Sequence, residues 1–220
     1  MKGDGTYVIV KSSRRPFTND TMISIPQMLM IGSTGRNSGK TTFAVEAIKR
    51  WKPHYQIIAL KVTAIDKHGR ECPRGGMGCG ACSSLCGDYE IIEELDPNTE
   101  KDTSQLLKSG ALRVFWLKSL RSNLQQGIKE FLSLIPSNTI IICESNSLRK
   151  SVKPGAFVIL HNAENGEIKI TAKDVWENAD SVIDKDMREH SDEVLDNLSI
   201  EHNDGELSIR LTLHSFNSSQ

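Results

Sequence analysis

One loop of the sequence has residue types and spacing that suit phosphate binding. Residues 35–42 read Gly-Arg-Asn-Ser-Gly-Lys-Thr-Thr and follow the apolar run Met28–Ile31. In such a strand–loop–helix unit, backbone N–H groups and the helix N-terminus hold phosphate oxygens. Lys40 would neutralise the β- and γ-phosphates, and the Thr41 hydroxyl would bind Mg²⁺. The pattern predicts a phosphate-binding loop (P-loop) with these nucleotide-binding residues: Gly35, Arg36, Asn37, Ser38, Gly39, Lys40, Thr41 and Thr42.

The loop departs from the usual P-loop pattern at its entry. The first glycine is expected five residues before Gly39, where this chain has Thr34, and a glycine follows at Gly35. Threonine disfavours the backbone angles that glycine tolerates, so we expect Thr34 to adopt an ordinary conformation and the loop entry to differ slightly. The alternative interpretation is a glycine-rich strand–helix turn with a lone lysine.

Two carboxylates and a second lysine could complete a phosphate site. Glu144 ends the apolar run Thr139–Glu144, and ligands of parallel sheets lie at the carboxyl ends of the strands. We expect Glu144 to bind Mg²⁺ and, with Lys40 and Asp102, to form the catalytic set; otherwise Glu144 is a solvated strand end. Asp102 begins a predicted helix, where it could be the N-cap or could bind Mg²⁺ or orient water. Lys61 closes another strand and would face the site or be solvated.

Four of the five cysteines lie close together in a stretch rich in glycine. They are Cys72, Cys79, Cys82 and Cys86. Four thiolates suit tetrahedral Zn²⁺ or an iron–sulfur cluster, and the spacing does not choose between them. His68 could replace one cysteine, and the alternatives are unliganded thiols or a redox disulfide. The fifth, Cys143, is expected in the core.

The elements that position these residues alternate between strands and helices, as a parallel sheet requires. Strands are predicted over Tyr7–Lys11, Met28–Ile31, Gln56–Val62, Arg113–Leu117, Thr139–Glu144 and Ala156–Leu160. Helices are predicted over Thr41–Trp51, Asp102–Gly110 and Leu124–Leu134. The fold class is therefore α/β, of the P-loop NTPase type, with a mostly parallel sheet flanked by helices and β-hairpins added at the termini.

The chain divides into three parts around this core. Residues 1–27 are predicted to form an N-terminal arm or hairpin, and residues 28–162 the nucleotide-binding core with a cysteine-rich insertion at 68–87. Residues 163–220 are expected to extend the same domain. Turn signals predict hairpins there at Asn165-Gly166 and at Asn203-Asp-Gly205.

Composition excludes several classes of partner. The formal net charge of −1 gives no basic field for nucleic acid or an anionic membrane. A membrane-spanning helix needs about 20 apolar residues, and no apolar run in the sequence is nearly that long. The N-terminus lacks the apolar core of a secretory signal. We therefore expect a cytoplasmic protein that binds neither nucleic acid nor membrane.

Beyond the P-loop, the order of several elements resembles the MobB family of molybdopterin-guanine dinucleotide biosynthesis proteins. The similarity covers about Met28–Leu160 and rests on Gly35–Thr42, Lys61, Lys101-Asp-Thr with Gly110-Ala111, and Glu144-Ser-Asn. It implies GTP binding, slow hydrolysis, support of molybdenum cofactor assembly and a homodimer. Where family members have a His-rich stretch, this chain has Lys67-His68 and the cysteine-rich insertion, which ordinary members lack.

Three functions are consistent with these features. The first is a MobB-like GTPase or ATPase that assists a metalloenzyme or cofactor-assembly client. The second is a ligase or kinase resembling dethiobiotin synthetase, which also pairs a P-loop with a strand-end glutamate. The third is a metal-binding adaptor that holds nucleotide without turnover. No Asn-Lys-x-Asp guanine motif is present, so GTP rests on the resemblance and ATP is equally compatible with the loop.

Overall fold

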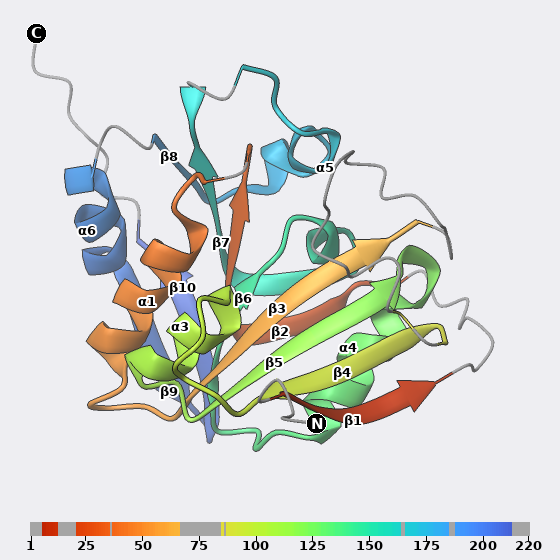
Figure 1. Ribbon diagram of the computed structural model, residues 1–220. Coiled ribbons are helices and arrows are strands. Elements are labelled where there is room, and N and C mark those ends of the chain that lie inside the picture. Colours follow the sequence, from red (N-terminus) through yellow and green to blue (C-terminus); the bar gives the residue numbers. More distant parts are fainter. Residues whose placement is uncertain are drawn as a thin grey trace, which may run out of the picture.

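The computed structural model describes residues 6–12, 21–35, 37–66, 85, 87–163, 166–184 and 188–212. Within these ranges, an eight-stranded sheet carries helices on both faces, and a two-stranded sheet packs beside it (Figure 1). The chain is thus an α/β structure with a mostly parallel sheet flanked by helices, as the alternation of elements predicted.

The strand order of the main sheet places the phosphate-loop strand near its middle. In spatial order the strands are β1 (Thr6–Ser12), β4 (Tyr89–Glu94), β5 (Arg113–Leu120), β3 (Ile57–Ile65), β6 (Ile140–Glu144), β2 (Ile23–Ser33), β7 (Val152–His161) and β8 (Ser181–Asp184). The strands from β5 to β8 run parallel, whereas β4 is antiparallel to β5 and β1 is antiparallel to β4. The carboxyl ends of β2, β6 and β3 therefore meet at one edge.

Apolar side chains on both faces of these strands make two core layers. Along β2, Leu29 and Ile31 belong to one buried cluster and Met28 and Met30 to the other, because successive side chains of a strand point to opposite faces. All four side chains are fully buried. This is why the central strands are continuous apolar runs instead of alternating ones.

Each core layer is closed by helices. On the Leu29 side lie α1 (Lys40–Trp51) and α3 (Asp102–Ser109), and on the Met28 side lies α4 (Leu124–Ser133) (Figure 1). Helix α1 buries Phe43, Ala44, Ala47, Ile48 and Trp51, which recur on one face of a 3.6-residue period. The helix is thereby fixed with its N-terminus at the carboxyl edge of the sheet.

The remaining elements are short or lie near the C-terminus. They are η1 (Arg121–Asn123), η2 (Ser147–Lys150), α5 (Ile170–Lys173), η4 (Trp176–Asn178), α6 (Arg188–Asp196), β9 (Leu198–Asn203) and β10 (Glu206–Leu211). Leu195 of α6 and Leu207 and Ile209 of β10 share the core cluster of Leu29. No helix in the described ranges is long and apolar enough to cross a membrane.

The structure corrects the predicted terminal hairpins. The N-terminal strand β1 pairs with β4 instead of forming a hairpin of its own, and β2 already begins at Ile23, inside the predicted 1–27 arm. The predicted hairpin at Asn165-Gly166 lacks its second strand among the described residues, because residues 166–169 form no strand and helix α5 follows; Asn165 itself lies outside the described residues. The hairpin around Asp204-Gly205 is confirmed: β9 pairs with β10, and both loop residues have positive φ, as a type I′ turn requires.

Candidate functional site

The loop between β2 and α1 has the backbone conformation that its glycine predicts. Gly39 has φ 85° and precedes the first residue of the helix, and Asn37 has φ 55°. Glycine adopts this left-handed region without steric cost, and asparagine tolerates it better than most residues. Gly35, Asn37, Ser38 and Gly39 of the predicted set lie in this loop, whereas Arg36 is outside the described residues.

Thr34, the departure from the usual glycine, is an anchor of the loop. Its φ is not positive, as expected, and its side chain is buried. The Asn162 N–H donates to Thr34 Oγ1 over 3.1 Å, and His161 Nδ1 lies 3.2 Å from the same oxygen. The Thr34 N–H in turn donates to the Leu160 carbonyl. The threonine therefore ties the loop entry to the end of β7.

The N-terminus of α1 opens into a pocket with a lysine beside it. Among the described residues no side chain caps the helix, so its N-terminus can face an anion. Lys40 Nζ donates to Ser33 Oγ over 2.7 Å, and Ser33 Oγ donates to the Gly35 carbonyl. The ammonium group thus rests on the loop that precedes its own helix.

Glu144 is a buried carboxyl group surrounded by polar side chains. It is 4% exposed at the end of β6, and Oε1 has no hydrogen-bond partner among the described residues. Desolvation raises the pKa of Glu144, while the charges of Lys61 and Lys40 and a hydrogen bond from Thr41 oppose that rise. Such an orphaned buried oxygen is costly unless a ligand or ion satisfies it.

Lys61 and Asp102 form an ion pair beside this glutamate. Lys61 stands opposite Glu144 in the β3–β6 register, and its Nζ contacts Asp102 Oδ2. β3 continues to Ile65, so Lys61 does not close the strand as predicted. The N-cap interpretation of Asp102 is also wrong: the N-cap of α3 is Lys101, and Asp102 is the first helical residue. The helix start still directs Asp102 toward Lys61.

Asn146 links the two strand ends through backbone hydrogen bonds. Its Oδ1 accepts from the Ser33 N–H over 2.7 Å, and its Nδ2 donates to the Ser33 carbonyl over 2.8 Å. A side-chain amide can mimic a peptide group in this way. The β2–β6 pairing therefore continues past Ile31 and Glu144 to the residue at which the loop begins.

These residues, apart from Thr34 and Gly35, line one pocket of about 560 Å³ at the carboxyl edge. Of the predicted residues it includes Asn37, Ser38, Gly39, Lys40, Thr41, Thr42, Asp102 and Glu144, and also Lys61. Sequence reasoning did not assign Ser33, Thr63, Ala64, Asn146, Lys169 and Thr171, which line it too. The polar run after Glu144 was a signal for Asn146; nothing in the sequence distinguished Lys169 or Thr171.

The residues of the predicted thiolate site are not among those that the structure describes. Cys72, Cys79, Cys82, Cys86 and His68 lie outside the described residues. Within the described ranges, no group of three or more His, Cys, Asp or Glu side chains gathers as a metal site. Cys143 is fully buried in β6, as expected of a core residue, and burial raises the pKa of its thiol above the usual range.

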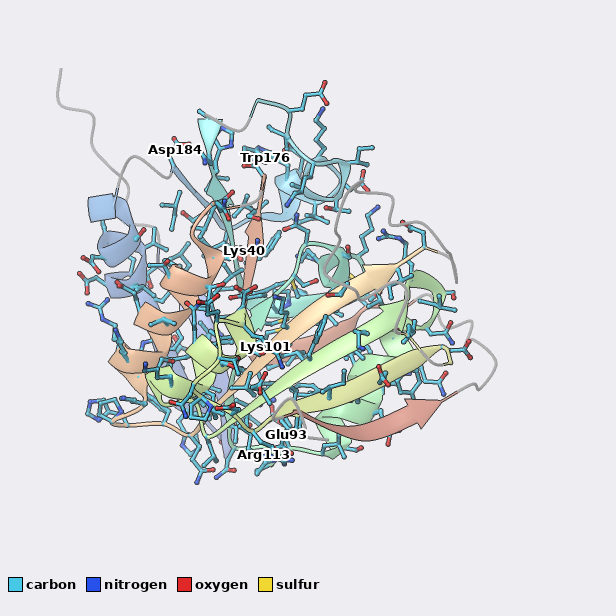
Figure 2. All side chains as sticks on the ribbon, in the orientation of Figure 1. Lys40, Glu93, Lys101, Arg113, Trp176 and Asp184 are labelled. Atoms are coloured by element: carbon cyan, nitrogen blue, oxygen red, sulfur yellow. The ribbon has the colours of Figure 1, made fainter. Side chains whose placement is uncertain are left out.

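A strong ion pair at the other end of the sheet does not belong to the site. Arg113 donates to both carboxylate oxygens of Glu93, over 2.6 and 2.8 Å. Figure 2 shows this pair and Lys40 in different parts of the molecule, since Arg113 begins β5 and the pocket lies at the carboxyl ends of its neighbours. We interpret the pair as a link between β4 and β5.

Comparisons of the chain with protein-family models, with curated proteins and with solved structures found no match. The functional assignment consequently depends on the geometry of the pocket.

Proposed function

We propose that the chain binds a magnesium–nucleoside triphosphate in this pocket and transfers the terminal phosphoryl group, slowly and to water in the absence of another acceptor. In this proposal the loop from Gly35 to Gly39 is a P-loop. Lys40 contacts the β- and γ-phosphates, and Thr41 and Glu144 hold Mg²⁺. GTP and ATP are both compatible with the described residues.

The observation that carries the proposal is the environment of Glu144. A carboxyl group that is 4% exposed, with an oxygen lacking a partner in the described structure, lines the same pocket as an uncapped helix N-terminus. Two ammonium groups, Lys40 and Lys61, act on it through their charges. A purely structural strand end has no reason to leave such a group unsatisfied.

The donor set fits Mg²⁺. The ion prefers hard oxygen ligands and is usually held by one or two protein oxygens together with phosphates and water. Thr41 and Glu144 line the same pocket, and Thr41 lies near enough to lower the pKa of the Glu144 carboxyl, so a hydroxyl and a carboxylate group lie close together there. Bound Mg²⁺ would neutralise charge on the β- and γ-phosphates.

The other charged residues suit charge stabilisation at the terminal phosphate. Lys61 stands opposite Glu144 in the sheet and is held by Asp102, so its ammonium group is oriented before any ligand arrives. Preorganised charge of this kind lowers the barrier to phosphoryl transfer. Asp102, whose side chain is 45% exposed, holds the Lys61 ammonium group in this position.

The wider role follows from the resemblance to the MobB family. We propose that nucleotide turnover assists assembly of a metal cofactor, with a metalloenzyme or assembly factor as client, and that the protein acts as a cytoplasmic homodimer. The cysteines at 72, 79, 82 and 86 would then hold Zn²⁺ or an iron–sulfur cluster.

Replacing Lys40 tests the proposal. Lys40→Ala should abolish the rise in melting temperature that Mg²⁺ with ATP or GTP gives the wild-type protein, because ligand stabilisation disappears with binding. Lys49→Ala is the matched control, since Lys49 is an exposed lysine on the same helix. An undiminished nucleotide shift in Lys40→Ala would contradict the P-loop assignment.

A further inference from the structure

The pocket extends to both sides of the phosphate loop. In the sheet order β3-β6-β2-β7, the loop leaves β2 and Glu144 ends β6, so both lie centrally. On one side the pocket is lined by Lys61, Val62, Thr63 and Ala64 of β3; we call this the β3 wing. On the other side it is lined by Lys169 and Thr171, which follow β7; we call this the β7 wing.

The charged residues determine which wing the terminal phosphate would face. Glu144 ends β6, on the β3 side of the loop, and the Lys61–Asp102 pair lies farther in the same direction. A triphosphate with its γ-phosphate among these groups directs its nucleoside toward the β7 wing. The β3 wing then lies beyond the γ-phosphate, where the nucleotide itself does not reach.

Hydrogen-bond donors line the β3 wing. Trp116 Nε1–H donates to Thr63 Oγ1 over 3.0 Å, so the threonine oxygen is used as an acceptor and its own proton can be donated to a ligand. Lys61 gives one of its three N–H groups to Asp102 and has others for a second partner. A ligand of this wing should therefore present hydrogen-bond acceptors.

The described pocket also lacks a base aligned for an uncharged acceptor. The carboxyl groups that line the described pocket are those of Asp102 and Glu144. Asp102 is paired with Lys61, and Glu144 is assigned to Mg²⁺ under the proposed function. An alcohol or amine must lose a proton when it attacks phosphorus, whereas a carboxylate attacks without proton transfer. This favours an acceptor that brings its own negative charge.

We propose that the β3 wing binds a small carboxylic acid, as its carboxylate, and that this is the phosphoryl acceptor. The inference rests on the proposed function and names its second substrate. One carboxylate oxygen forms a bond to the γ-phosphorus. The bond from that phosphorus to the β,γ-bridging oxygen breaks, and its electron pair leaves with the nucleoside diphosphate. The products are an acyl phosphate and a diphosphate, with no net oxidation or proton uptake. Thr63 and Lys61 orient the carboxylate.

The test uses the full chain with Mg²⁺, ATP or GTP, and a series of carboxylic acids from formate to citrate. Hydroxylamine in the reaction converts an acyl phosphate into a hydroxamate, which iron(III) reveals by colour. With the wild-type protein we expect hydroxamate in proportion to the nucleoside diphosphate formed. Thr63→Val should lower its yield about tenfold to a hundredfold, the value of one hydrogen bond to a charged group. Thr63→Ser, which keeps the hydroxyl, should restore it.

Two readouts separate this inference from the proposed function. Nucleotide binding, measured by the thermal shift with Mg²⁺, should be unchanged in Thr63→Val because Thr63 lies beyond the phosphates. Release of diphosphate and phosphate without hydroxamate for every acid would overturn the acceptor site and leave the P-loop assignment intact. Equal hydroxamate yields in Thr63→Val and the wild type would overturn the assigned location. Absence of the nucleotide shift in the wild type would overturn the proposed function itself.

Discussion

Glu144 faces opposite demands from folding and from ligand binding. The four residues before it in β6 are apolar and fully buried, so the strand carries the carboxyl group into a dry environment. The pKa of Glu144 is raised there, chiefly by desolvation. A divalent cation would favour the ionised form that burial disfavours. The same residue should therefore limit stability without ligand and support activity with it.

Glu144→Gln should slow phosphoryl transfer much more than it weakens nucleotide binding. An amide keeps the size of the side chain but loses the charge that helps to position Mg²⁺ at the transition state. We expect a fall in kcat of about tenfold or more, with a smaller change in the nucleotide thermal shift. Wild-type turnover in this variant would reduce Glu144 to a structural strand end.

The same substitution should stabilise the ligand-free protein at neutral pH. The folded-state pKa of Glu144 lies above the ordinary value of 4.5, so the folded state binds more protons than the unfolded state once the pH exceeds that value. Stability contributed by this group is then lost as the pH rises. In EDTA, melting temperatures measured from about pH 4 to about pH 8 should favour Glu144→Gln increasingly with pH. A constant difference across that range would contradict the buried, destabilising carboxylate.

Among the elements, the junction of β2 with β6 determines where the loop starts. Gly32 lies in β2 just before Ser33, and a Cβ atom on Gly32 would lie 2.6 Å from Asn146 Oδ1. Glycine therefore permits the close approach by which Asn146 bonds both backbone groups of Ser33. Ser33 in turn receives the Lys40 ammonium group, so the strand junction supports the lysine indirectly.

Asn146→Ala should destabilise the fold by about 1–3 kcal/mol, because it leaves backbone groups of Ser33 without their partners. It should also weaken nucleotide binding through the displaced loop. Urea unfolding measures the first effect, and nucleotide thermal shifts measure the second. Asn98→Ala is the control: Asn98 is exposed, and we expect a change within about 0.5 kcal/mol. Equal stabilities of the two variants would show that the side-chain bridge contributes nothing.

The sequence predicted the strands and helices that have one clear apolar pattern, either a continuous apolar run or apolar residues at helical spacing. β2, β3, β6 and β7 are apolar because both faces are covered, and α1 and α4 repeat apolar residues at helical spacing. β4 went unpredicted because Tyr89–Glu94 contains three glutamates. Each has a basic partner in the fold: Lys101 lies near Glu94, and two partners come from farther along the chain, Lys118 for Glu90 and Arg113 for Glu93. Partners so far apart in the chain leave no local pattern.

The residues of the candidate site likewise fall into those that a local sequence pattern predicted and those that only the tertiary fold brings to the pocket. Lys40, Thr41 and Glu144 were predicted because each lies at a strand or helix end with a characteristic neighbour. Lys169 and Thr171 reach the pocket only because the segment after β7 turns back over the loop, where the Lys169 N–H donates to the Thr34 carbonyl. That return depends on tertiary contacts and has no signature in the sequence around it.

At the scale of the whole molecule, the cysteine-bearing segment is attached beside the candidate nucleotide site. β3 ends at Ile65, just after the pocket residues Thr63 and Ala64, and β4 begins at Tyr89. Asp66, the next residue, is paired with Arg121 over 2.7 Å, and that hydrogen bond holds the pKa of Asp66 below its ordinary value. The chain therefore enters the segment from a fixed point at the carboxyl edge of the sheet.

We predict that Cys72, Cys79, Cys82 and Cys86 bind one metal centre and that nucleotide changes its accessibility. Thiolate coordination would contribute folding free energy to a glycine-rich segment with few apolar residues. A triphosphate that contacts Lys61 would weaken the ion pair between Lys61 and Asp102, close to where the cysteine-bearing segment begins. The end of β3 would then have one arrangement with nucleotide and another without it, and this difference would couple the two sites. The measurements are metal content after anaerobic purification, and the rate of metal release to a chelator with and without Mg²⁺ and a non-hydrolysable triphosphate.

Lys40→Ala is the control, because it should remove any effect of nucleotide while leaving the metal bound. Equal release rates in the wild type would remove the coupling, and absence of stoichiometric Zn or Fe would remove the metal site.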